Sequence, residues 1–311
     1  MRIGKIKESI LKRSVLRQLN KEPDGDAGVG VVTNPVEGWT LAAPRAVYGA
    51  VNALVASGLL PAALALTLLM PPGTEEKQLK QFMKELGGLC AREGLAVTAG
   101  HTAVSSAVNT LLLSVTGMGT SCRKAESVSV KSPDKNLDVV MTGHAGREGA
   151  ALLAIEREDQ LQGRYAPSYI ETAKHFYDHA GQSAAAGILW QCGAVRMHDI
   201  REGGVFGALW ELSSAVGTGL DIELKDIPVR QHTIEICEFF DLNPYKLLSG
   251  GCLLALCPDG EEAVSRLMAG GIPAEIIGKT SGGNDRLIRY DTETRYLEPS
   301  GMDEIYKVIS F

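Results

Sequence analysis

The residues best suited to chemistry cluster in one segment, 197–205 (MHDIREGGV). Four ionisable side chains fall within five positions there, and a glycine pair leads into a helical pattern over Phe206 to Val216. A helix N-terminus presents unpaired N–H groups and the positive end of the helix dipole, so this segment suits an anion such as phosphate. A purely structural turn before a capped helix is the alternative. The side chains and glycines concerned are His198, Asp199, Arg201, Glu202, Gly203 and Gly204.

Two further segments could contact a phosphate. Segment 97–104 (VTAGHTAV) contains His101 between Gly100 and Thr102. An imidazole can donate to a phosphate oxygen or titrate near neutral pH, and a hydrogen bond that only fixes the loop is the alternative. Gly143 lies in a TGHAG turn after a predicted strand and before a predicted helix. This turn is either structural or a second phosphate turn.

Taken together, these segments resemble the aminoimidazole-ribonucleotide synthetase superfamily, which has the PurM-like fold, and within it the HypE hydrogenase-maturation branch. Members of that branch have sequences close to GGHTEV where this chain has AGHTAV, and close to HDxTEGG where it has HDIREGG. The matches keep their order and spacing over nearly the whole chain. The other matching stretches are MRIGKI at 1–6, DGDAGV at 24–29 (GEDAAV in the family), LTLLMPPGT at 66–74, MTGHAGREGAALLA at 141–154 and IGK at 277–279.

The resemblance implies a nucleotide-dependent enzyme. Relatives bind ATP with Mg²⁺ and phosphorylate the oxygen of an amide or a similar group, which turns that oxygen into a good leaving group. Metal ions stabilise the charge in such transfers, and Mg²⁺ prefers oxygen ligands. Asp26 matches the acid of the family's loop and is the expected metal ligand. The resemblance implies nucleotide binding by Gly25, Asp26, Asn52, Gly100, Thr102, Gly143, Gly203 and Gly204, and catalytic roles for His101, His198, Asp199 and Glu202.

Three positions depart from the family in the same way. Ala43 and Ala53 stand where relatives have acids in STDP and VNDLAAMGA, and Ala103 replaces the glutamate of GGHTEV. No Asp or Glu occurs between Thr40 and Leu69, so no shift of the first two alignments restores an acid. Alanine cannot ligate a metal. Phosphoryl transfer is therefore expected to be weakened or lost, while a phosphate site built from backbone N–H groups could persist.

Two more departures bear on function. The family's C-terminal cysteine is missing, since the last cysteine is Cys257, which argues against a thiocarbamate-carrying role. Arg201 stands where relatives have Thr, and it either helps to bind an anion or pairs with Asp199 or Glu202. Three hypotheses follow. They are an ATP-dependent HypE-like enzyme with rearranged metal ligation, a non-catalytic dimeric scaffold or regulatory relative, and, as a weaker alternative, a kinase of thiamine phosphate or selenium phosphate type.

Composition narrows the range of partners. The chain has 311 residues, of which 45% are hydrophobic and 22% charged, and its net charge of −6 argues against nucleic acid as a partner. No apolar run reaches the ~18 residues that a membrane span needs, and no signal peptide is recognisable. Six cysteines without a CxxC pair argue against a zinc site and favour a reducing cytoplasm.

The hydrophobic pattern predicts two α/β halves joined by a polar linker. Mixed strands and helices in both halves imply α+β or α/β layering. Strands are predicted at 29–33, 63–69, 96–99, 110–117, 138–142, 252–257 and 274–279, and helices near 5–17, 45–57, 75–93, 148–157, 170–181, 204–216, 232–239 and 260–268. The resemblance implies a two-domain PurM-like fold. An N-terminal domain (1–120) would pair in a homodimer near the nucleotide, followed by a linker (121–137) and a C-terminal α/β sandwich domain (138–311).

Overall fold

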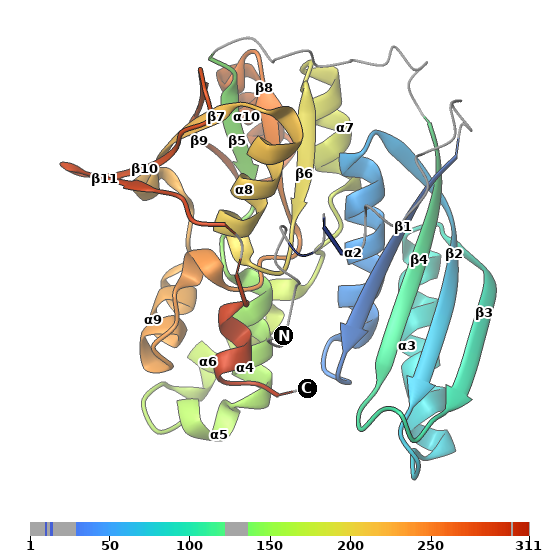
Figure 1. Cartoon of the computed structure of the whole chain (residues 1–311). Helices are drawn as coiled ribbons and strands as arrows, with labels where there is room; N and C mark the ends of the chain where they lie inside the picture. The colour runs from blue at the N-terminus through green and yellow to red at the C-terminus, as the bar shows by residue number, and fades with distance from the viewer. Residues whose placement is uncertain (1–9, 11–12, 15–28, 122–135, 300, 311) are drawn as a thin grey trace.

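The computed structural model describes residues 10, 13–14, 29–121, 136–299 and 301–310, and these form two sheet-containing domains that lie side by side (Figure 1). Gly25 and Asp26 lie outside the described residues. The same holds for most of the helix predicted at 5–17 and of the linker predicted at 121–137. These expectations therefore stay predictions.

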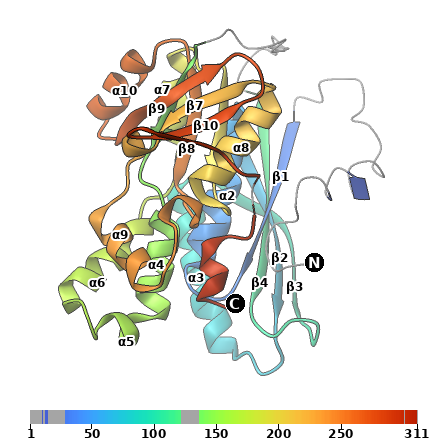
Figure 2. The ribbon, with the colours of Figure 1, turned by 60° about the vertical axis from the view of Figure 1, so that its left-hand side comes forward.

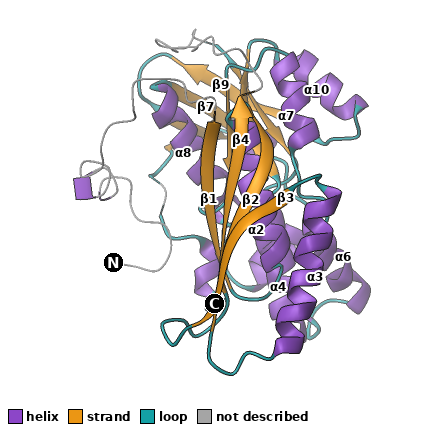
Figure 3. Cartoon of the chain, turned by 90° about the vertical axis from the view of Figure 1, so that its right-hand side faces the viewer, coloured by secondary structure: helices purple, strands orange, loops and turns teal. Residues whose placement is uncertain are grey.

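The N-terminal domain is a four-stranded sheet, in the order β1-β4-β2-β3, with two helices on one face. Buried side chains alternate along the strands, as at Leu64, Leu66 and Leu68, because successive residues of a strand face opposite sides of the sheet. The opposite face is turned toward the viewer in Figure 3, and neither helix crosses it. The elements are β1 (Val29–Glu37), α2 (Ala42–Ala56), β2 (Leu59–Met70), α3 (Glu76–Arg92), β3 (Ala96–Val104) and β4 (Leu112–Ser121).

The C-terminal domain contains a seven-stranded sheet, in the order β11-β10-β7-β9-β5-β8-β6. Val139 and Met141 of β5 pack in the cluster that includes α8, while Val140 between them packs toward α7 and α10. The strands are β5 (Asp138–Thr142), β6 (Arg196–Ile200), β7 (Gly219–Glu223), β8 (Cys252–Cys257), β9 (Ala274–Ser281), β10 (Arg286–Tyr290) and β11 (Glu293–Tyr296). The α-helices are α4 (Arg147–Glu156), α5 (Glu158–Leu161), α6 (Pro167–Lys174), α7 (Ser183–Gln191), α8 (Gly204–Val216), α9 (Gln231–Phe239) and α10 (Gly260–Ala269). Short 3₁₀ turns are η3 (His175–Tyr177), η4 (Leu224–Asp226), η5 (Pro244–Lys246) and η6 (Glu304–Lys307).

The sequence pattern is least accurate in the middle of this domain. The single helix predicted at 170–181 is wrong, because α6 ends at Lys174, a 3₁₀ turn follows, and His179 takes a left-handed backbone conformation with φ of 55°. A left-handed residue with a bulky side chain cannot continue an α-helix. Helix α7 and the strands β6, β7, β10 and β11 were not predicted at all.

Helix α2 joins the two domains. Of its 15 residues, 13 are buried, as expected for a helix that packs on more than one side. The Asn52 side chain donates to the Ala180 carbonyl (3.0 Å) and accepts from the Gln182 N–H (2.8 Å). Arg45 forms an ion pair with Glu148 at 2.9 Å, and both side chains are buried. The helix thus belongs to the packing of both sheets (Figure 1).

Among the described residues, no helix combines the length and apolar character that crossing a bilayer requires.

Candidate functional site

Segment 197–205 lies where β6 ends and α8 begins, at the edge of the C-terminal sheet that faces α2. Gly203 caps α8 in a left-handed conformation, with φ of 86°. A side chain at Gly204 would not fit, since its Cβ would lie 2.5 Å from the Tyr245 carbonyl oxygen. The glycine pair therefore brings the backbone close to η5, which is one physical reason for its presence.

His198 faces away from the turn. Its Nε2 lies 3.0 Å from a carboxylate oxygen of Glu211 on α8, and both side chains are partly buried. This contact orients the imidazole along the helix. The structure does not bring His198 into contact with His101, the other histidine predicted to be catalytic.

Arg201 pairs with Asp199 and reaches across to the other domain. Its Nε lies 2.6 Å from Oδ2 of Asp199, whose carboxylate is buried, and its Nη1 donates to Oδ1 of Asn34 on β1 at 2.6 Å. The Asn34 amide in turn donates to the carbonyls of Arg45 (3.0 Å) and Ala46 (3.1 Å). Of the roles considered for Arg201, pairing with Asp199 is the one observed. The guanidinium stands between an acid of one domain and an amide of the other.

The Asp303 carboxyl group occupies the position at the start of α8 where an anion was expected to bind. The Gly203 N–H donates to Oδ2 of Asp303 at 2.7 Å. Oδ1 of Asp303 accepts from the N–H groups of Leu248 (3.2 Å) and Ile305 (2.9 Å), and the side chain is fully buried. Burial raises the pKa of Asp303 to about 8, although these N–H donors oppose the shift. Figure 2 shows the C-terminal segment with η6 running below α8.

Gly100, His101 and Thr102 lie on β3, at the far edge of the N-terminal sheet. Strands β4 and β2 separate β3 from β1, so about 14 Å lies between the two edges. The register pairs His101 with Thr67, which puts its side chain on the sheet face opposite the helices. Within one chain, the two halves of the predicted site are therefore not brought together.

Asp26, the expected magnesium ligand, lies outside the described residues. No three His, Cys, Asp or Glu side chains converge within the described part of the chain. Ala43 is 1% exposed in the apolar core, and Ala53 stands ten residues further along α2, about 15 Å away. Asp199, a predicted acid at the domain junction, already forms an ion pair with Arg201. Ala103, like His101, lies on the far edge strand.

Other predicted ligands also have partners. The Asn52 side-chain amide forms hydrogen bonds with the backbone of Ala180 and Gln182 in the other domain. Glu202 lies partly buried next to the glycine pair and contributes to the raised pKa of Asp303. Gly143 stands in a tight turn before α4, where a Cβ would lie 2.7 Å from Sγ of Cys252. That contact explains the glycine by packing.

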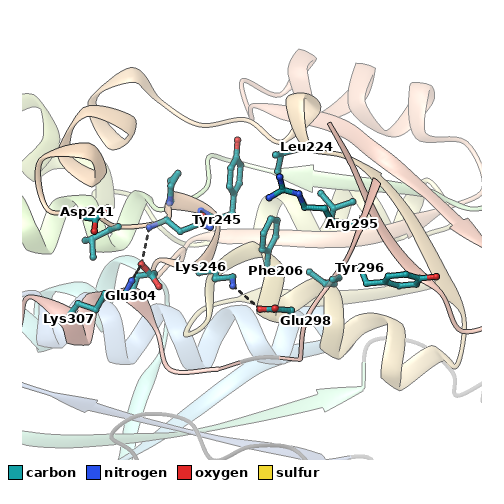
Figure 4. A pocket seen from close by; sticks show the side chains of 15 residues that line it. Phe206, Leu224, Asp241, Tyr245, Lys246, Arg295, Tyr296, Glu298, Glu304 and Lys307 are labelled. Atoms are coloured by element: carbon teal, nitrogen blue, oxygen red, sulfur yellow. Dashed lines mark hydrogen bonds and ion pairs between the residues drawn. The ribbon is translucent and has the colours of Figure 1, made fainter. Parts of the chain in front are cut away.

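A separate cavity of about 780 Å³ opens in the C-terminal domain, and none of the predicted site residues lines it (Figure 4). The rings of Phe206 and Tyr245 stack in its wall, with centroids 5.4 Å apart and planes 10° from parallel. Lys246 pairs with Glu298 at its rim. The sequence carried no signal for this cavity, because its lining comes from six separate elements (α8, η4, η5, β10, β11 and η6) and from loops.

Sequence reasoning missed Asn34 at the domain junction and Asp303 at the start of α8. Asn34 is a polar residue at a helix-facing position of β1, and that alternation was an available signal. Asp303 offered none, because its partner Gly203 is 100 residues away in the chain.

Two sheets packed through α2 define a two-domain α/β protein of the PurM-like fold. The chain belongs to the AIR synthase related protein family, whose N-terminal domain matches residues 27–121 and whose C-terminal domain matches residues 137–290. The carbamoyl dehydratase HypE of Rhodobacter capsulatus is 25% identical over 254 residues, which cover 79% of this chain and 72% of that protein. These matches confirm the resemblance to the HypE branch.

Solved structures show the same fold. A crystal structure of E. coli HypE superposes with a TM-score of 0.77 at 18% identity and covers 97% of each chain. HypE in complex with ATP superposes with a TM-score of 0.71 at 17% identity, covering 96% of this chain and 95% of that one.

Proposed function

We propose that this chain is a HypE-like protein that has lost phosphoryl transfer and acts as a non-catalytic dimeric scaffold or regulatory partner. The observation that carries the proposal is the Arg201 guanidinium between Asp199 and Asn34. A fixed cation at this point neutralises the acid that a metal would need as a ligand. Ala43, Ala53 and Ala103 stand at the positions where relatives have the other expected acids.

The closed turn at Gly203 supports the same proposal. A phosphate at the start of α8 would have to displace the Asp303 carboxylate, which accepts three backbone N–H groups. Displacing this acceptor would leave three buried N–H donors for the phosphate to satisfy, and an unsatisfied buried donor costs about 1–3 kcal/mol. Any residual binding of nucleotide is therefore expected to be weak at this turn and independent of Mg²⁺.

A homodimer is part of the proposal. Val29, Val31 and Leu60 lie on the sheet face that the helices leave uncovered, and each is more than half exposed. Apolar groups in a continuous patch favour burial against another protein surface. The register puts His101 and Ala103 on this same face. A second copy docked here would bring His101 close to residues of its partner, which one chain alone does not achieve.

We infer a cytoplasmic setting from cysteine chemistry. The described cysteines, Cys90, Cys192, Cys237, Cys252 and Cys257, are all free thiols. Free buried thiols are typical of proteins kept in a reducing compartment.

The competing function is an ATP-dependent enzyme. It is favoured by the HypE structure that contains ATP and by relatives named as carbamoyl dehydratases. Calorimetric titration of the purified chain with ATP, with and without Mg²⁺, separates the two. We expect no Mg²⁺-dependent binding and no phosphate release. Mg²⁺-dependent binding with turnover would overturn the proposal, and the Rhodobacter capsulatus protein titrated in parallel provides a comparison under the same conditions.

A further inference from the structure

The cavity beside α8 has the size and the walls of a small-molecule site. Its volume of about 780 Å³ falls within the roughly 300–1,000 Å³ that is usual for such sites. Ligand sites also combine apolar and aromatic walls with a few polar groups that orient the ligand. The apolar walls of this cavity include Leu224, Leu242, Ile288 and Leu297. The cavity can therefore enclose a ligand of ordinary metabolite size.

An aromatic pair gives the cavity a preference for planar ligands. Phe206 and Tyr245 stack with their planes 10° from parallel, and both residues stay partly exposed. Figure 4 shows both rings in the middle of the cavity. Tyr296, which is 70% exposed, adds a third ring at one end. Aromatic rings favour offset-stacked or edge contacts with another ring, so a planar ring is the best match for this wall.

Six charged side chains line the cavity, and five of them are paired with a charge of opposite sign. The pairs are Lys246–Glu298 (3.3 Å), Lys307–Glu304 (2.6 Å) and Arg295–Glu293 (2.6 Å), of which Glu293 lies outside the lining. A cleft that attracts a polyanion concentrates charge of one sign. The paired charges of this lining do not, so a nucleotide or another polyanion is a poor match.

The sixth charged side chain is Asp241, which follows α9. Within the described part of the chain, its carboxylate has no hydrogen-bond or ion-pair partner. Asp241 lies at the end of the cavity opposite Tyr296, with the stacked rings between them (Figure 4). The cavity thus has one uncompensated negative charge beside an aromatic wall, and a cationic group would complement it.

We propose that this cavity binds a small aromatic amine. The planar ring packs against Phe206 and Tyr245, and the ammonium group binds the Asp241 carboxylate. A hydrogen bond between two charged groups gives orientation as well as affinity. The inference goes beyond the proposed function, because none of the predicted nucleotide-binding, catalytic or metal-binding residues lines this cavity.

Titration calorimetry with tryptamine, without nucleotide or Mg²⁺, tests the proposal. We expect saturable binding with a Kd of about 1 mM or below. Two matched ligands separate the contributions of ring and charge. Indole-3-propionate keeps the ring and carries a carboxylate in place of the ammonium group, whereas propylamine keeps the ammonium group and lacks the ring. Both should bind at least about fivefold more weakly than tryptamine.

Asp241→Asn should weaken tryptamine binding about tenfold and leave indole-3-propionate binding unchanged or stronger, because only an ammonium group contacts this carboxylate. Asparagine tolerates the left-handed backbone at this position, where φ is 53°, so the fold should be kept, and thermal unfolding checks it. The matched control is Glu238→Gln, which removes an exposed carboxylate of α9 outside the lining. It should leave tryptamine binding within about twofold.

Four outcomes would overturn the proposal. They are no saturable binding of tryptamine, equal binding of tryptamine and indole-3-propionate, equal binding of tryptamine and propylamine, and equal losses in the Asp241 and Glu238 variants. Because ATP and Mg²⁺ are absent from these titrations, failure here leaves the test of the proposed function unaffected.

Discussion

The Arg201 side chain carries a permanent charge into the junction between the domains. A guanidinium provides directed donors at fixed angles, so it forms an ion pair with the Asp199 carboxylate and donates a hydrogen bond to the Asn34 amide oxygen at the same time. The same two oxygens could serve a divalent cation if the guanidinium were absent.

Replacing Arg201 with Thr should therefore change what the junction binds. We expect Arg201→Thr to gain weak, millimolar binding of Mn²⁺ and to lose about 1–3 kcal/mol of stability, because Asp199 keeps its burial and loses its partner. Electron paramagnetic resonance of added Mn²⁺ and urea unfolding measure the two effects. Arg201→Lys, which keeps a cation, is the matched control. Equal Mn²⁺ binding by the wild type and Arg201→Thr would contradict the prediction.

Asp303 should make stability depend on pH in an unusual direction for a carboxyl group. Burial raises its pKa to about 8, above the value of ~3.9 in an unfolded chain. The native state then holds more protons than the unfolded state between these values, and this contribution to stability falls as the pH rises from about 4 to about 8.

Asparagine at position 303 removes the titration. Urea unfolding at pH 5 and pH 8 gives the free energy of unfolding of both proteins. Relative to the wild type, the stability of Asp303→Asn should be higher at pH 8 than at pH 5. If the difference in the free energy of unfolding between the two proteins stays constant across this range, the three backbone donors keep the carboxylate charged throughout.

Among the elements, α2 is the one on which both domains depend. Its Gly49 faces the Asn34 side chain of β1, and a Cβ there would lie 2.1 Å from Nδ2 of Asn34. The asparagine cannot retreat without giving up its bonds to the carbonyls of Arg45 and Ala46.

We therefore expect Gly49→Ala to destabilise the chain by about 2–3 kcal/mol through overpacking. The matched control is Gly87→Ala on α3, where no atom lies within 4 Å of the added Cβ. That variant should be stabilising by about 0.5–1 kcal/mol, because alanine is the better helix former. Urea unfolding compares the two, and equal effects would show that Asn34 adapts freely.

A comparison of predicted and observed helices and strands shows which elements the sequence pattern predicts. The helix predicted at 204–216 matches α8, because an apolar stripe follows a glycine pair that starts the helix. Strand β6 was missed since its sequence, RMHDI, places charged residues where a strand pattern expects apolar ones. The sequence also named His101 and Asp199 as parts of one site. Their separation follows from the strand order β1-β4-β2-β3, which long-range pairing sets and local patterns do not encode.

The two partners of Arg201 at the junction were not equally visible in the sequence. Arg201 was recognised as a candidate partner of Asp199 because the two are close in sequence. Asn34 is 167 residues from Arg201, and no local feature announces that contact.

At the scale of the whole molecule, the uncovered sheet face should decide the oligomeric state. Val31 is 61% exposed on β1 and faces away from the helices. Val31→Asp should convert a dimer into a monomer, because a buried carboxylate at the interface would lack a partner. Light scattering after gel filtration measures the mass. Met268→Asp, at a residue 57% exposed on α10, should remain dimeric. A monomeric wild-type chain would contradict the proposed pairing.

Two long-range contacts, one within the C-terminal domain and one across the domain junction, have a consequence for the order of folding. Gly203 and Asp303 are 100 residues apart, and Arg45 and Glu148 are 103 apart. Contacts of such long sequence separation cost loop entropy before they return any energy, so they form slowly. During synthesis, the Gly203 turn leaves the ribosome long before Asp303 does. A nascent chain therefore passes through a stage in which the N–H groups at the start of α8 are open to solutes, and only the later segment shuts them.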